Sequence, residues 1–314
     1  MHTPVMLQES LEALAINPRG TYVDLTFGRG GHAKAVLSQL KGGRLFAFDQ
    51  DQAAVEVAAQ LPSSCFTFIK ANARFMRQFL AFHGVHQVDG VLADLGVSSH
   101  QIDIAERGFS TRWKGALDMR MDQSSSLTAQ EIVNSYSVSQ LQQLLQNYGE
   151  VRNARTLAQA IVTHRATKPI HTTEDLRMLL QRWAPRGREN KYYAQVFQSF
   201  RIEVNDELGA LKELLQQSAS LLRPRGRMVV LSYHSLEDRL VKHFLNTGNF
   251  DGELDKDVYG NVLRPFRPMY KKPMRPSDKE IQVNNRARSA RLRVGERIDS
   301  IASAALQVTN RLTI

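Results

Sequence analysis

Short apolar runs alternate with helical periodicity from residue 20 to about 96, and this alternation constrains the fold more than any other feature. The runs with the length and character of buried strands are TYVDLTF (21–27), RLFAFD (44–49), CFTFIKA (65–71) and VDGVLADLG (88–96). Between them, apolar residues recur at helical spacing in two sets: Ala33, Val36, Leu37, Leu40 and Ala54, Val57, Ala58, Leu61. Strands that alternate with helices predict βαβ units, and therefore an α/β domain with a mostly parallel sheet.

The alternation stops between about residues 109 and 207, where helical patterns occur without a convincing strand. Three of the predicted helices are SQLQQLLQNYG (139–149), VRNARTLAQAIVTHRA (151–166) and TTEDLRMLLQRWAP (172–185). The last begins at Thr172, with Asp175 three residues later, which is the spacing of a capping box.

The alternation then resumes with a leucine-rich helix that ends at RPRG, followed by the apolar strand MVVLSYHS (228–235). Ser235 is predicted to cap the next helix, SLEDRLVKHFLN. A connection of about 130 residues between two strands that one helix would normally join argues for a domain inserted into a single sheet. We therefore predict a discontinuous core at 1–108 and 208–314, and an inserted all-helical domain at 109–207 that recognises the substrate.

The composition indicates the compartment and the class of partner. The chain has 314 residues, a net charge of +10 and one cysteine, Cys65. One cysteine excludes an internal disulfide framework and any multi-thiolate metal site, and no metal is predicted. The sequence shows neither an apolar run of about 20 residues nor a signal-peptide pattern. These features predict a cytoplasmic protein without a membrane partner, and the positive charge favours a polyanion such as nucleic acid.

Much of the positive charge lies in residues 264–297, where 11 Lys or Arg face 3 Asp or Glu. Four prolines interrupt this stretch, which predicts a basic, partly extended arm. Arg286, Arg288, Arg291 and Arg293 have nearly alternate spacing. That spacing predicts several guanidinium groups on one side of a strand-like segment, where they would contact RNA phosphates.

A glycine turn between the first strand and its helix predicts a nucleotide-type cofactor site. Gly28-x-Gly30-x-x-Ala33 satisfies a dinucleotide fingerprint, and Asp49 ends the second strand about 20 residues later, where it can accept ribose hydroxyls. Enzymes that use S-adenosylmethionine share this arrangement, so spacing does not separate the two cofactors. Asp24 before the turn favours methyl transfer, because a carboxylate beside pyrophosphate is repelled. Asp94 at the end of the fourth strand adds an acceptor at the carboxyl edge, and the positive net charge suits a polyanionic substrate. Nicotinamide chemistry remains the alternative.

Seven sequence blocks closely resemble the ribosomal RNA small subunit methyltransferase H family, also called MraW. They are HTPVML, DLTFGRGGH, LADLGVSS-x-Q-x-D, ERGFS, LDMRMD, SYHSLEDR and NRARSARLR, in family order from residue 2 to about 293. The resemblance implies a Rossmann-like methyltransferase core interrupted by a helical domain. It also implies transfer of a methyl group from S-adenosylmethionine to N4 of a cytidine in the decoding region of 16S ribosomal RNA, within the small ribosomal subunit.

Carried over position by position, the resemblance assigns the cofactor site to a small set of residues. Gly30, Gly31 and His32 belong to the glycine turn, Asp49 to the ribose and Phe75 to the adenine, while Asp94 and Gln101 complete the pocket. The chain departs from the family pattern at His100 and around Lys191–Tyr193, where we expect effects on RNA docking or loop rigidity. Whether the chain forms a homodimer is left open.

For the chemistry, Asp94 is the candidate catalytic residue, although it could instead serve only the cofactor. His32 is a candidate general base, with a positioning role as the simpler interpretation. Phe109, Trp113 and Tyr233 are candidates to stack on an extruded base, although aromatic side chains near strand ends more often belong to the core. A non-catalytic RNA-binding factor for ribosome assembly is the alternative from a different functional class.

Overall fold

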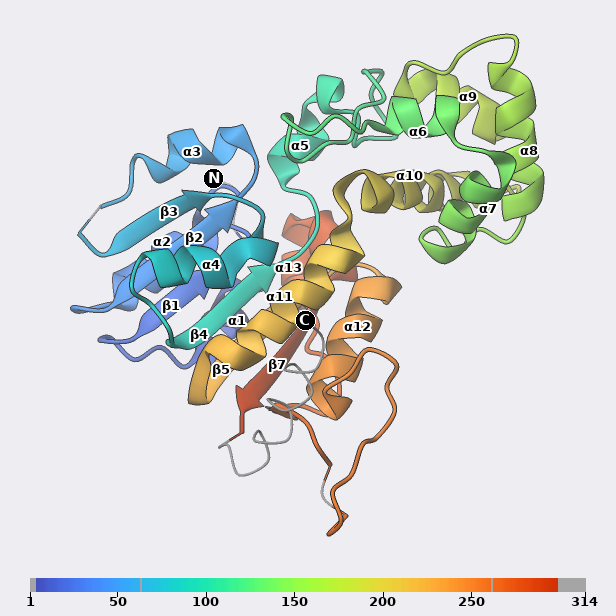
Figure 1. The fold of residues 1–314 in the computed structure, drawn as a ribbon. Coiled ribbons are helices and arrows are strands. Elements are labelled where there is room, and N and C mark those ends of the chain that lie inside the picture. Colours follow the sequence, from blue (N-terminus) through green and yellow to red (C-terminus); the bar gives the residue numbers. More distant parts are fainter. Residues whose placement is uncertain (1–3, 63, 261, 299–314) are drawn as a thin grey trace. The chain divides into compact units, whose positions relative to one another are not determined.

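The computed structural model describes residues 4–62, 64–260 and 262–298. Contacts divide the chain into two compact units: a sheet unit, Met1–Gly96 with Gly209–Ile314, and a helical unit, Val97–Leu208 (Figure 1). The sequence places the first boundary later, between residues 108 and 109. The earlier boundary has a physical reason, because the Arg107 guanidinium donates hydrogen bonds to the carbonyl oxygens of Arg120 and Met121, inside the helical unit.

Among the described residues, the sheet unit contains a seven-stranded sheet in the order β3-β2-β1-β4-β5-β7-β6. Strands β1 to β5 are parallel, and β7 is antiparallel to both of its neighbours, β5 and β6. The strand order changes direction between β1 and β4, which is where ligands bind in open α/β sheets. The strands are β1 (Thr21–Asp24), β2 (Arg44–Asp49), β3 (Phe66–Lys70), β4 (Val88–Asp94), β5 (Leu222–Ser232), β6 (Phe266–Pro268) and β7 (Arg291–Arg297).

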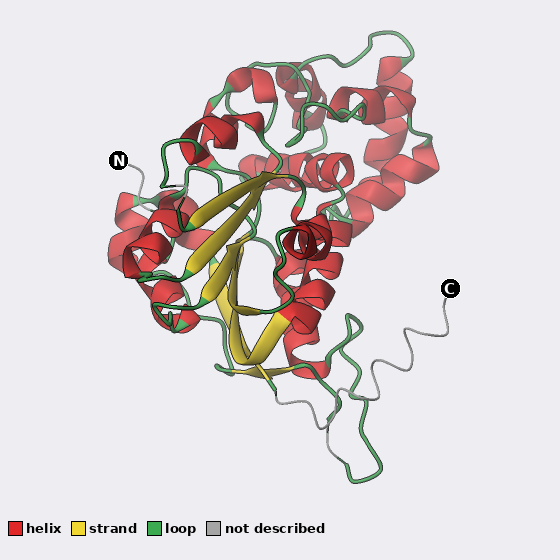
Figure 2. Ribbon diagram, turned by 60° about the vertical axis from the view of Figure 1, so that its left-hand side comes forward, coloured by secondary structure: helices red, strands yellow, loops and turns green. Residues whose placement is uncertain are grey.

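Helices cover both faces of this sheet (Figure 2). Side chains alternate along each strand, so Val23 and Val91 pack with α4, α11 and α12, whereas Tyr22 and Leu92 pack with α1, α2 and α3. Because both faces are buried, the strands read as continuous apolar runs in the sequence. The helical segments of the unit are α1 (Leu7–Leu14), α2 (Gly31–Gln39), α3 (Gln52–Ala58), η1 (Ala73–Phe75), α4 (Met76–Phe82), α11 (Glu207–Leu221), α12 (Ser235–Thr247), α13 (Asp278–Val283) and η3 (Asn285–Ser289).

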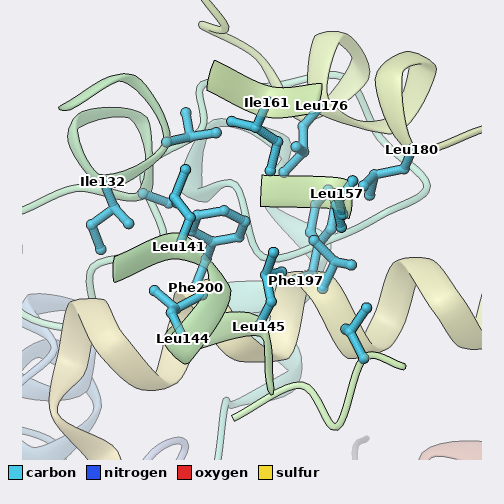
Figure 3. Packing of buried hydrophobic residues seen from close by; sticks show 14 of the residues in the cluster. Ile132, Leu141, Leu144, Leu145, Leu157, Ile161, Leu176, Leu180, Phe197 and Phe200 are labelled. Carbon is cyan, nitrogen blue, oxygen red and sulfur yellow. The ribbon is translucent and has the colours of Figure 1, made fainter. Parts of the chain in front are cut away.

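The helical unit has its own hydrophobic core, built from the apolar faces of α6 to α10 (Figure 3). No strand forms in 97–208, all of which the structure describes, and this confirms the predicted all-helical insertion. The capping box at Thr172 and Asp175 is also confirmed. The helical segments are α5 (Ser99–Asp103), η2 (Ala105–Arg107), α6 (Ala129–Ser135), α7 (Val138–Asn147), α8 (Ala154–Arg165), α9 (Thr173–Gln181) and α10 (Glu189–Asn205). Within the described parts of both units, no helix has the length and apolar character needed to cross a membrane.

The predicted helix cap at Ser235 is wrong by one residue. His234 has the extended backbone of an N-cap, and its ring nitrogen accepts from the backbone N–H of Glu237. The Glu237 carboxylate accepts in return from the backbone N–H of His234 and of Tyr233. Ser235 is therefore the first residue inside the helix, because the imidazole replaces the hydroxyl that usually fills this position.

Two segments of the predicted basic arm (264–297) belong to the sheet. Residues 266–268 and 291–297 form β6 and β7, and Arg286 and Arg288 lie in the short helix η3 rather than in a strand. Arg291 and Arg293 both bind the buried carboxylate of Asp238, at 2.8 and 2.7 Å. Burial opposes ionisation of Asp238, but the hydrogen bonds from the two guanidinium groups outweigh it and lower the pKa of this carboxyl. These two arginines therefore stabilise the fold.

We expect Asp238→Ala to lower the free energy of unfolding by roughly 2–3 kcal/mol, because it leaves two partly buried guanidinium groups without their carboxylate. Urea unfolding at pH 7 measures this change. The loss should shrink at acidic pH, since the stability that a lowered carboxyl pKa supplies is lost as pH falls through that pKa. Glu213→Ala is the matched control, because Glu213 binds Arg74 with about half of its side chain exposed. An equal loss in both variants would contradict the assignment.

Candidate functional site

Three carboxylates lie at the carboxyl ends of neighbouring parallel strands. Asp24 ends β1, Asp49 ends β2 and Asp94 ends β4. The β1–β2 register pairs Asp24 with Ala47, and the β1–β4 register pairs it with Leu92, two residues before the end of each partner strand. This edge is also the one at which the strand order changes direction, so these residues define the candidate site.

Asp24 is the most unusual of the three carboxylates because it is buried and incompletely hydrogen-bonded. Its side chain is 2% exposed, and Oδ1 accepts from the backbone N–H of Thr26 at 3.0 Å. Oδ2 is buried and has no hydrogen-bond donor among the described residues. Burial raises the pKa of Asp24 to about 6, while nearby His32 opposes the shift. A buried acceptor without a donor favours a ligand group that brings both a hydrogen and a positive charge.

Asp49 binds the glycine turn directly. Its Oδ2 accepts from the backbone N–H of Gly28 at 2.7 Å, and its Oδ1 accepts from that of Asp51 at 2.8 Å. Burial raises the pKa of Asp49 despite these bonds. Because a carboxylate has about four acceptor positions and Asp49 also accepts from the backbone N–H of Gln50, the carboxylate as a whole retains the capacity to accept a ribose hydroxyl.

The turn that carries Gly30, Gly31 and His32 runs from β1 into the first turn of α2, as the sequence predicts. Gly30 has φ +71°, and a Cβ atom there would lie 2.8 Å from the Phe27 ring. A Cβ atom on Gly31 would lie 2.2 Å from Cγ of Pro4. Both positions therefore require glycine, and the tight turn leaves backbone N–H groups at the N-terminus of α2.

Asp94 is approached by two side chains of the sheet unit. The hydroxyl of Tyr233 donates to Oδ1 of Asp94 at 2.6 Å, and Nδ1 of His32 lies 3.8 Å from Oδ2. The backbone N–H of Asp94 donates to the hydroxyl oxygen of Thr26 at 2.6 Å, which ties the end of β4 to the end of β1. The sequence predicts Tyr233 only as a stacking candidate, because its hydroxyl contact with Asp94 joins residues 139 positions apart.

Phe75 and Gln101, the other two predicted cofactor residues, lie in different structural environments. Phe75 ends the short helix η1 after β3, and the residue is 44% exposed, which makes it available to a ligand. Gln101 belongs to the helical unit, where its side-chain oxygen accepts from the backbone N–H of Ser98 and closes a capping box on α5. The capping role was not predicted, although Ser98 and Gln101 show the spacing that indicates it.

The remaining candidates are divided between surface and core positions. Trp113 is 58% exposed, whereas Phe109 packs partly on the core of the helical unit with the Arg107 guanidinium over its ring. Tyr192 and Tyr193 are buried in that core, and the Tyr192 hydroxyl donates to the Asn153 side chain at 2.9 Å. Burial gives these two tyrosines a packing role, and an effect of the Lys191–Tyr193 departure on RNA docking or loop rigidity stays a prediction.

The donor and acceptor set at the carboxylate edge fits S-adenosylmethionine. The buried, unsatisfied oxygen of Asp24 suits a cationic amino group, Asp49 suits the ribose hydroxyls and the exposed residue Phe75 suits the adenine. A pyrophosphate would meet the carboxylates of Asp24 and Asp94 with like charge, which disfavours a nicotinamide dinucleotide.

Comparisons with known proteins identify close relatives of this chain. A relative from Amoebophilus asiaticus, named Ribosomal RNA small subunit methyltransferase H, is 60% identical over 296 residues, covering 94% of this chain and 96% of its own. A relative of the same name from Cytophaga hutchinsonii is 56% identical over 296 residues, covering 94% and 99%. Among solved structures, an rRNA methylase from Streptococcus thermophilus is 12% identical with a TM-score of 0.41, covering 95% and 99%.

The model of one protein family matches almost the whole chain. This is the MraW methylase family, and its match extends over residues 1–298. The chain therefore belongs to the MraW methylase family, and its sheet unit is the Rossmann-like domain of a methyltransferase that uses S-adenosylmethionine.

Proposed function

We propose that this protein transfers a methyl group from S-adenosylmethionine to the exocyclic N4 of a cytidine in the decoding region of 16S ribosomal RNA. The observation that carries the proposal is the position of Asp94, a carboxylate that ends β4 beside the cofactor edge. The names of the relatives support methylation of small-subunit ribosomal RNA. The choice of N4 and of the decoding region rests on the motif resemblance. Such a substrate would place the activity in the cytoplasm.

The chemistry requires an acceptor for the amine hydrogens. A cytosine amino group is a poor nucleophile because its lone pair is delocalised into the ring, so a carboxylate that accepts one of its N–H groups favours attack. Asp94 supplies that carboxylate. The residues that follow it, Leu95, Gly96 and Val97, include neither proline nor an aromatic residue, so the stacking surface for the base must come from elsewhere.

The cofactor residues have separate roles in this proposal. Asp24 would bind the cationic amino group, Asp49 the ribose and Phe75 the adenine. When bound, the cofactor would supply a methyl group attached to a sulfonium sulfur. As the new N–C bond forms, the S–C bond breaks and the sulfur becomes a neutral thioether. The amine loses one proton to Asp94 and then to solvent, so no metal is needed to activate the leaving group.

For RNA binding, we propose that Arg286 and Arg288 in η3 contact phosphates. Both side chains are exposed, unlike that of Arg293, which binds Asp238. We expect the double charge reversal Arg286→Glu with Arg288→Glu to weaken RNA affinity by at least about tenfold at low salt and to reduce the salt slope, because fewer counterions are released.

A filter-binding titration against 16S RNA at several salt concentrations measures both changes. The matched control is the double reversal Arg19→Glu with Lys41→Glu, which changes two exposed cations at the amino ends of β1 and β2. If the η3 pair and the control pair gave the same affinity and salt slope, the phosphate contacts would have to lie elsewhere.

The function itself is tested by incubating the protein with labelled S-adenosylmethionine and undermethylated small subunits. Mass spectrometry of the nucleosides then identifies the product, which we expect to be N4-methylcytidine. A different methylated nucleoside would overturn the specificity. Absence of transfer to any RNA, with RNA binding retained, would favour a non-catalytic assembly factor. Stabilisation by NAD(P) instead of adenosylmethionine would favour the oxidoreductase alternative.

A further inference from the structure

Tyr233 connects the end of β5 to the carboxylate of Asp94. It follows directly after β5 (Leu222–Ser232), which pairs with β4, and its hydroxyl donates to Oδ1 of Asp94 at 2.6 Å. Its own backbone N–H donates to the carboxylate of Glu237, in the first turn of α12, at 2.9 Å. The backbone of Tyr233 is therefore held by the strand that precedes it and by the helix that follows.

The hydroxyl of Tyr233 is the donor in its hydrogen bond to Asp94. Burial raises the pKa of this phenol above its ordinary value, and the negative charge of Asp94 raises it further. Because the phenol keeps its proton, the hydrogen bond runs from Tyr233 to the carboxylate. A short bond of this kind is assisted by the charge of the acceptor and favours the ionised form of the acid.

The geometry around His32 complements this bond. Nε2 of His32 lies 3.2 Å from the carbonyl oxygen of Val5, and a carbonyl only accepts, so this nitrogen carries the hydrogen. Nδ1, the other ring nitrogen, lies 3.8 Å from Oδ2 of Asp94. Asp94 thus has Tyr233 at one oxygen and His32 near the other, and the rotation of its carboxylate is restricted from two sides.

We propose that Tyr233 is a positioning residue for methyl transfer: its hydroxyl orients the Asp94 carboxylate and keeps it ionised while the substrate amine donates to it. This inference rests on the proposed function, in which Asp94 accepts from the amine. Since a carboxylate oxygen accepts more than one hydrogen bond, the contact to Tyr233 is compatible with a second donor.

The phenylalanine variant separates this role from simple packing. Tyr233→Phe keeps the ring and removes the donor, and we expect kcat to fall about 10- to 100-fold, the scale expected when one hydrogen bond to a charged group is lost. The affinity for adenosylmethionine should stay within about twofold of wild type. The acid limb of the kcat profile should move to higher pH, because the ionised form of Asp94 loses a hydrogen bond that favours it.

Two further variants complete the test. Tyr22→Phe removes a buried hydroxyl that accepts from the backbone N–H of Asn17 at 2.6 Å, at the amino end of β1, and should leave kcat unchanged. In an Asp94→Asn background, Tyr233→Phe should have little further effect, because the two residues act as a unit. If the losses of the two single variants added up in the double variant, the inference would be overturned. Wild-type kcat together with an unshifted pH profile in Tyr233→Phe would also overturn it.

Failure of the proposed function can be distinguished from failure of the proposed role of Tyr233. If the wild-type protein transferred no methyl group to cytidine N4, the proposed function would fail before any variant was compared. If wild type were active and Tyr233→Phe equally so, only the role of Tyr233 would fail. Thermal unfolding of Tyr233→Phe beside Tyr22→Phe shows whether a loss of turnover merely reflects a loss of structure.

Discussion

Asp94→Asn is expected to lower kcat for methyl transfer by about 10²- to 10⁴-fold, the usual contribution of a positioned acid or base. Asparagine has nearly the same shape, and its carbonyl oxygen can still accept from the Tyr233 hydroxyl. The amide nitrogen of asparagine, however, is a hydrogen-bond donor. It cannot accept a hydrogen bond from the substrate amine, and it takes up no proton. Steady-state transfer of labelled methyl groups into undermethylated small subunits measures kcat, and single-turnover transfer measures the chemical step without a contribution from product release.

The control for this variant lies on the same strand. Asp89 is near the amino end of β4, where it accepts from the backbone N–H of Thr21 and binds Arg223. Asp89→Asn should leave kcat unchanged, since it alters a carboxylate at the opposite end of β4. Normal turnover in Asp94→Asn together with a large loss of cofactor affinity would show that Asp94 serves the cofactor and not the amine.

Asp24→Asn is expected to change cofactor affinity and apoprotein stability in opposite directions. The affinity for adenosylmethionine should fall by at least about tenfold, because a cationic amino group loses its carboxylate. The free energy of unfolding without cofactor should rise at pH 8, because the buried charge is removed. Since the pKa of Asp24 is raised from 3.8 to about 6, the gain is at most roughly 3 kcal/mol.

The raised pKa of Asp24 determines the direction in which stability and cofactor affinity change with pH. The folded protein binds a proton at Asp24 more tightly than the unfolded chain does, so this residue makes stability fall as pH rises from about 4 to about 6. Cofactor affinity should change in the opposite sense and weaken below about pH 6, where Asp24 becomes protonated. Asp24→Asn should abolish both trends. Calorimetric titration and urea unfolding across this range measure them, and unchanged affinity in the variant would remove Asp24 from the cofactor site.

The sheet core could be predicted closely from the sequence. RLFAFD matches β2 (Arg44–Asp49) at both ends, and VDGVLADLG contains β4 (Val88–Asp94). These predictions succeed because the signals are local: a buried parallel strand must be apolar along its length, and a helix must repeat its apolar positions with its own period. The acidic residues that end these strands could also be grouped in advance, because parallel strands share one carboxyl edge.

The basic C-terminal stretch could not be predicted in the same way. Its prolines and charges resemble those of an extended arm, yet the structure builds β6 and β7 from it. Arg291 and Arg293 pair with Asp238, more than 50 residues earlier in the chain. Only the antiparallel pairing of β5 with β7 brings these charges together, and no local pattern encodes a partner at that separation.

The sequence by itself determined the α/β core, the helical insertion, the glycine turn and the three acidic residues at the candidate site, because each depends on neighbours within one element or one turn. Only the tertiary structure decided which groups those acids meet. The 139-residue separation between Tyr233 and Asp94 is closed by the pairing of β4 with β5, and the missing hydrogen bond at Asp24 results from burial by the whole sheet unit. Burial and long-range pairing depend on all the packed elements at once, whereas periodicity and capping depend on a few adjacent residues.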